Sequence, residues 1–133
     1  MQKIFLHGLA AGLVSAIACL FYCEVYSSAM RVDFSTVINI YSVMGVCLFG
    51  SMIASAGYYL LSIKVSNVDI VDVVFNLFFI TLTFFSCIYP FLAKLPLNLK
   101  SPELFPGLVI PMHFFPVLFW VALNPVFKHG RKV

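Results

Sequence analysis

The sequence predicts an all-α integral membrane protein: a bundle of four spanning helices, the fourth kinked by prolines. Apolar residues make up 62% of the 133 residues and charged residues only 10%, whereas a soluble domain has about 45–50% and about 25%. The mean hydropathy is +1.06. A soluble fold of this size could not hide so much apolar surface from water.

Charged residues divide the chain into four apolar segments, and each is long enough for the roughly 20 residues that a spanning helix needs. The connections between them are short, so the whole chain, residues 1–133, forms one domain. The predicted spans cover residues 4–26, 37–63, 70–93 and 104–127.

The same composition excludes other classes of protein. The net charge is +3 and the basic residues are scattered, which is not typical of a nucleic-acid-binding protein. The high apolar content excludes a disordered chain. Residues 75–80 (FNLFFI) do not alternate in polarity, as the strands of a membrane barrel would.

Lysine and arginine residues indicate the orientation in the membrane, because cytoplasmic loops carry an excess of them. The side that holds both termini has five such residues and the other side has three, which predicts cytoplasmic termini. The five are Lys3, Lys64, Lys128, Arg131 and Lys132, and the three are Arg31, Lys94 and Lys100.

Small residues follow one stripe of each of the first two spans, including Gly8 and Gly12 in the first and Gly50 and Gly57 in the second. In lipid, helices associate where small residues let their backbones approach closely. These four glycines therefore predict a tight pairing of the first two helices within one chain. Homodimerisation through the same stripe is the alternative.

Prolines interrupt the last span. An interior proline lacks the N–H that would bond the carbonyl four residues earlier, so Pro111 frees the carbonyl of Gly107 and Pro116 frees that of Met112. A kinked or partly unwound helix is expected, and its freed carbonyls need partners inside the membrane.

Three short motifs resemble a family of small four-helix bacterial membrane proteins of unknown function. They are residues 8–13 (GLAAGL), residues 89–91 (YPF) and the pair Met112-His113. The resemblance covers most of the chain, and it implies four helices and a special position for His113. It also implies a bacterial cytoplasmic (inner) membrane, but no activity.

His113 lies about 14 Å into the last span, near the middle of the membrane, where an ionisable side chain is a functional candidate by default. The structural interpretation is a neutral ring bonded to a carbonyl or hydroxyl of the first or second helix, with Ser15, Tyr41 and Ser42 as possible partners. The functional alternatives are a haem or metal ligand, a proton relay and a quinone contact.

Other polar side chains have structural interpretations. Glu24 falls near the non-cytoplasmic interface, and Asn76 and Asn124 are expected to form an amide pair between the third and fourth spans. Asp69 and Asp72 are expected to stabilise the start of the third helix. No cysteine or histidine spacing indicates a metal site or a cofactor.

These residues suggest no catalytic chemistry and therefore no enzyme. The preferred hypothesis is an accessory or assembly subunit of a larger membrane complex, surrounded by lipid and by other membrane subunits, with Phe78 and Phe85 as contact residues. A homodimeric small transporter that uses Glu24 or His113 is the second hypothesis. A haem- or quinone-associated redox subunit is the third.

Overall fold

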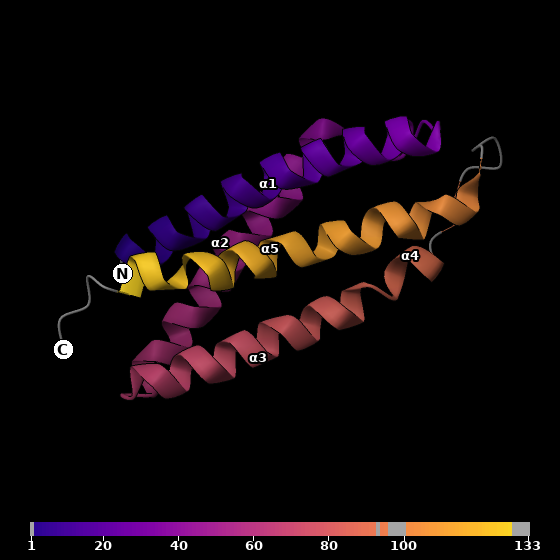
Figure 1. The fold of residues 1–133 in the computed structure, drawn as a ribbon. Helices are drawn as coiled ribbons and strands as arrows, with labels where there is room; N and C mark the ends of the chain where they lie inside the picture. Colours follow the sequence, from indigo (N-terminus) through magenta and orange to yellow (C-terminus); the bar gives the residue numbers. More distant parts are fainter. Residues whose placement is uncertain (1, 93, 96–100, 129–133) are drawn as a thin grey trace.

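The computed structural model describes residues 2–92, 94–95 and 101–128, and it confirms an all-α bundle with four helices that are long and apolar enough to cross a membrane (Figure 1). The elements are α1 (Gln2–Met30), α2 (Ile40–Lys64), α3 (Val68–Ser86), the short α4 (Tyr89–Leu92), the 3-10 turn η1 (Pro102–Leu104) and α5 (Phe105–Lys128). Three of the eight basic residues behind the predicted orientation, Lys100, Arg131 and Lys132, lie outside the described residues.

Helices α1 and α5 run antiparallel and side by side, and α3 lies on the other side of α5 in the view of Figure 1. Helix α2 crosses behind them, from the end of α1 to the start of α3. The start of α1 and the end of α5 therefore lie at the same end of the bundle. The four helices alternate in direction, as short connections require.

The closest approach of two helices is between α1 and α2. A Cβ atom added at Gly8 would lie 2.7 Å from the carbonyl oxygen of Ser51, and one added at Gly12 would lie 3.1 Å from that of Cys47. The Ser55 hydroxyl crosses the same contact and donates to the carbonyl of Ile4 at 3.2 Å. Small residues on both helices thus bring the two backbones together.

Two of the four predicted packing glycines lie elsewhere. Nothing is within 4 Å of a Cβ atom added at Gly50, so this glycine is not in a helix contact within the described chain. At Gly57 the added atom would meet Phe75 of α3 at 3.5 Å rather than α1. The face of α2 that meets α1 is lined instead by Cys47, Ser51 and Ser55, which are all buried.

Asparagine side chains begin two of the helices. Asn39 accepts from the N–H of Tyr41 at the start of α2, and Asn67 accepts from the N–H groups of Asp69 and Ile70 at the start of α3. The helix N-cap prefers such short polar side chains. The carboxylate of Asp72 was expected to serve the same purpose and does not, because it is buried further along α3.

The third span is broken into α3 and α4. Helix α3 ends at Ser86, and the N–H of Cys87 is shared between the carbonyls of Thr83 and Phe84, each at 3.2 Å. Pro90 has no N–H to offer the carbonyl of Ser86, which weakens the helix at this point and favours the break between α3 and α4. It fits instead near the start of the new short helix.

Helix α5 begins at Phe105, close to the predicted start of the last span at residue 104, and it follows η1 directly. Ser101 precedes Pro102 in a left-handed conformation (φ 55°, ψ 57°) and its side chain makes no capping hydrogen bond. The sequence predicted a kinked or partly unwound helix, and α5 is not unwound: it is one continuous helix with Pro111, Pro116 and Pro125 inside it.

Candidate functional site

Side chains of α1 donate hydrogen bonds to backbone carbonyls of η1 and the start of α5, and Pro111 leaves one of these carbonyls without its helical partner. The Tyr22 hydroxyl donates to the carbonyl of Gly107 at 3.0 Å, which is the group left without an N–H partner by Pro111. One turn away, the Tyr26 hydroxyl donates to the carbonyl of Leu104 at 2.9 Å. A Cβ atom at position 107 would lie 2.5 Å from that hydroxyl, so glycine is needed for the approach.

The next proline is compensated in the same way. Pro116 leaves the carbonyl of Met112 without its helical partner, and the Cys19 thiol donates to that carbonyl at 3.6 Å. The Ser15 hydroxyl donates to the carbonyl of its own helix at Ala11 and also approaches the carbonyl of Phe115, at 2.6 and 3.2 Å. The polar face of α1 therefore replaces backbone bonds that α5 lacks, as membrane burial requires.

A buried polar and aromatic cluster lies at the end of the bundle that holds the start of α1. His7 is 5% exposed, its Nε2 lies 2.9 Å from the carbonyl oxygen of Trp120, and its ring stacks on the rings of Trp120 and Phe127 at 4.2 and 5.0 Å. In the same cluster the Tyr58 hydroxyl donates to the carboxylate of Asp72, and the ring of Tyr58 lies 5.9 Å from that of Trp120.

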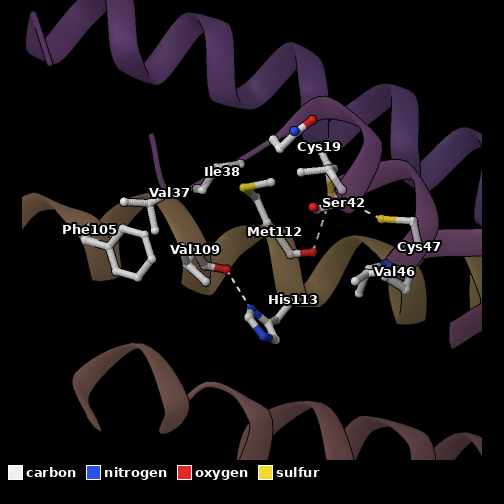
Figure 2. Close-up of a pocket in the computed structure, with 13 residues that line it drawn as sticks. Cys19, Val37, Ile38, Ser42, Val46, Cys47, Phe105, Val109, Met112 and His113 are labelled. Carbon is white, nitrogen blue, oxygen red and sulfur yellow. Dashed lines mark hydrogen bonds between the residues drawn. The ribbon is translucent and has the colours of Figure 1, made fainter. Parts of the chain in front are cut away.

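The second feature is a cavity of about 270 Å³ between α2 and α5 (Figure 2). One stripe of each helix lines it, and residues 37–39, which precede α2, contribute as well. The lining includes Ile38, Ser42 and Val46 on one side and Phe105, Val109, His113 and Pro116 on the other, with Cys19, Cys47 and Met112 between them. Most of these side chains are apolar, so the cavity suits an apolar occupant.

His113 is partly buried at the edge of this cavity, and its bonding differs from the prediction. Its Nδ1 lies 2.8 Å from the carbonyl oxygen of Val109, one turn earlier on the same helix. No hydrogen bond joins it to Ser15 or Tyr41 among the described residues, because Ser15 bonds backbone carbonyls and Tyr41 is 83% exposed. Ser42 lines the same cavity without a bond to the ring.

Glu24 and His113 are not brought together. Glu24 is exposed on α1 and does not line the cavity. The amide pair expected between Asn76 and Asn124 is also absent from the described structure: both side chains are half-buried, and the buried Oδ1 of Asn76 has no hydrogen-bond partner there.

The cysteines are free thiols, and two of them are neighbours. The sulfurs of Cys19 and Cys47 lie 3.8 Å apart, where α1 and α2 meet beside the cavity. Within the described residues, no group of three His, Cys, Asp or Glu side chains could hold a metal ion.

The fold and these sites define a class of protein, a four-helix integral membrane protein with an apolar cavity between two of its helices. No family model, curated protein or solved structure matches the chain. Sequence reasoning missed the roles of His7, Tyr22, Tyr26 and the buried Tyr58–Asp72 pair. The signal for three of them was present: polar residues recur along α1 at positions 7, 15, 19, 22 and 26, which is the spacing of one helix face.

Proposed function

We propose that this protein is an accessory or assembly subunit of a larger membrane complex, with no catalytic activity of its own. One observation supports the proposal: Phe78 and Phe85 of α3 are 62% and 66% exposed and lie on the same face of that helix. Their spacing of seven residues is two helical turns. We call this surface the α3 aromatic face.

Other side chains of α3 make its contacts with the bundle. Val71 and Phe75 are buried, and the Phe75 ring lies 5.4 Å from the rings of both Tyr58 and Trp120. Further along, Phe84 meets Phe114 of α5 with ring centroids 5.2 Å apart. Phe78 and Phe85, by contrast, keep more than half of their surface exposed, and this surface is available to a partner.

Exposure of apolar side chains to lipid is ordinary in a membrane, so the aromatic character of the face is what favours a protein partner. Helix association in lipid depends on van der Waals packing rather than on the hydrophobic effect. Phenylalanine rings offer large, rigid contact areas with specific ring geometries. A groove between the helices of a larger subunit would supply the matching surface.

Co-purification from native membranes in mild detergent tests this proposal. Phe78→Ala with Phe85→Ala should release the protein from its complex, while its thermal unfolding in detergent stays close to that of the wild type. The matched control is Phe21→Ala with Phe49→Ala, because these rings are 72% and 74% exposed on α1 and α2. Equal effects of the two double variants, or an isolated monomer in the wild type, would contradict the proposal.

The same purification separates the other two hypotheses. A homodimer without further subunits favours the transporter that uses Glu24 or His113. A Soret absorption band favours the haem-associated subunit, with His113 as a ligand.

We also place the protein in a bacterial cytoplasmic membrane with both termini on the cytoplasmic side. The charge bias supports this orientation, and the resemblance to small bacterial four-helix proteins supports the membrane.

A further inference from the structure

The hydrogen bond of His113 determines which ring nitrogen carries the proton. A backbone carbonyl oxygen can only accept, so the Nδ1 that lies 2.8 Å from the Val109 oxygen must be the donor. A charged imidazolium is energetically unfavourable inside a membrane, so the ring is neutral. In the neutral ring that results, Nε2 has no proton and is a hydrogen-bond acceptor.

This acceptor has no donor within the described part of the chain. Nδ1 makes the one hydrogen bond found for the ring, and Ser42, which lines the same cavity, does not bond it. His113 lies eight residues after Phe105, or about 12 Å along α5. Bulk water does not reach that depth of the hydrocarbon core. A polar group without a partner is unfavourable there, so a donor from outside the chain would be stabilised.

The cavity beside His113 extends from the connection before α2, where Asn39 lines it, along the spanning parts of α2 and α5. Val46 on its rim is 72% exposed on a spanning helix, so lipid can reach this part of the cavity. Between Phe105 and Pro116 it follows α5 for about 16 Å, close to the thickness of one leaflet. Its volume of about 270 Å³ is at the lower end for ligand sites, and it suits one alkyl chain or one small ring system.

We propose that this cavity binds a membrane-dissolved molecule with an apolar body and a hydroxyl group, whose O–H donates to Nε2 of His113. The apolar stripes of α2 and α5 hold the body, and the imidazole selects the hydroxyl. Aliphatic alcohols and phenols share this chemistry. The site is independent of the α3 aromatic face, because no residue of α3 lines the cavity.

Photolabelling of the purified protein in lipid nanodiscs tests the site. The probe is a dodecanol with a diazirine in its chain, and the matched control probe is its methyl ether, which cannot donate a hydrogen bond. We expect the alcohol to label cavity residues such as Val46 and Val109 about five- to tenfold more than the ether, the ratio that one ordinary hydrogen bond provides. An excess of unlabelled dodecanol or of an alkylphenol should compete with the probe.

Variants identify the acceptor. His113→Leu should lower labelling by the alcohol to the level of the ether, whereas Val46→Phe should fill the cavity and lower labelling by both probes. Thr81→Val is the control, because Thr81 is exposed on α3 and bonds its own helix at Leu77. Equal labelling by alcohol and ether would overturn the proposal and leave the cavity to bulk lipid chains.

A second measurement does not depend on the folding of a His113 variant. Nitrogen NMR of the wild-type protein labelled with ¹⁵N-histidine reports the Nε2 resonance directly. Dodecanol should shift this resonance towards the value of a hydrogen-bonded acceptor, and the ether should not. A ring protonated at Nε2, or one that responds equally to both molecules, would also overturn the proposal.

Discussion

The Tyr22 hydroxyl lies 3.0 Å from the carbonyl oxygen of Gly107, the group that Pro111 leaves without its helical N–H partner. The Cys19 thiol stands in the same relation to Met112 and Pro116, at 3.6 Å. Because the two helices are antiparallel, successive turns of α1 meet successive turns of α5. Pro111 and Pro116 are therefore tolerated in a continuous helix because α1 supplies the missing donors.

Removing the Tyr22 hydroxyl should destabilise the protein through the carbonyl of Gly107. We expect Tyr22→Phe to lower the free energy of unfolding by about 1 kcal/mol, the typical contribution of such a bond in a membrane protein. Thermal unfolding in detergent measures it. Tyr41→Phe is the control, since Tyr41 is 83% exposed and its hydroxyl makes no hydrogen bond with a described residue.

The same bond predicts a coupling with Pro111. Pro111→Ala restores an N–H that can bond the carbonyl of Gly107, so Tyr22→Phe should cost less in that background than in the wild type. A double-mutant cycle over the two positions measures this difference. Strictly additive effects would show that the Tyr22 hydroxyl and the N–H restored at position 111 do not bond the same carbonyl.

The glycines of the first two helices should differ sharply in their response to alanine. Gly8→Ala places a Cβ atom 2.7 Å from the Ser51 carbonyl oxygen and should destabilise by about 1–3 kcal/mol through overpacking. Gly50→Ala meets nothing within 4 Å and should stabilise by up to about 1 kcal/mol, because alanine favours a helix. Similar losses at both positions would mean that the close contact between α1 and α2 is not at Gly8.

The hydrogen bond from Tyr58 to Asp72 should be important for stability. Both residues are buried, at 4% and 6% exposure, and a carboxylate that loses a donor in such surroundings is costly. We expect Tyr58→Phe to lower the free energy of unfolding by about 1–3 kcal/mol. Tyr59→Phe, one residue further on α2, should have little effect, because the Tyr59 hydroxyl bonds no described residue and the substitution keeps the ring that packs against the core. Equal melting temperatures of the two variants would contradict the role of the bond.

Cysteine labelling checks the orientation. In a background with Cys23 and Cys87 replaced by Ala, a cysteine at Lys64 should react with a membrane-impermeant maleimide from the cytoplasmic side only. A cysteine at Arg31 should react from the opposite side only, since these positions follow successive spans. The reverse pattern would show that the charge bias of five to three does not set the topology.

The sequence by itself determined that the protein lies in a membrane, how many helices span it and which backbone carbonyls would lack a hydrogen-bond donor. These properties depend on composition, on the length of each apolar run and on the covalent structure of proline, so they need no knowledge of neighbours. The expected spans at residues 4–26 and 104–127 fall within α1 and within the η1–α5 span. The sequence likewise showed that Gly8 and Gly12 belong to one stripe of small residues on the first helix.

The tertiary structure alone decided which side chains meet those groups. His113 bonds its own helix, Gly50 faces open space, and Asn76 does not reach Asn124, although each pattern allowed another outcome. The reason is geometric: helix periodicity fixes which residues share a face, but the rotation of each helix about its axis and the crossing of α2 depend on all the packing contacts together. Only that packing sets Tyr22 of α1 against the freed carbonyl of Gly107 and leaves Nε2 of His113 without a donor from the described chain.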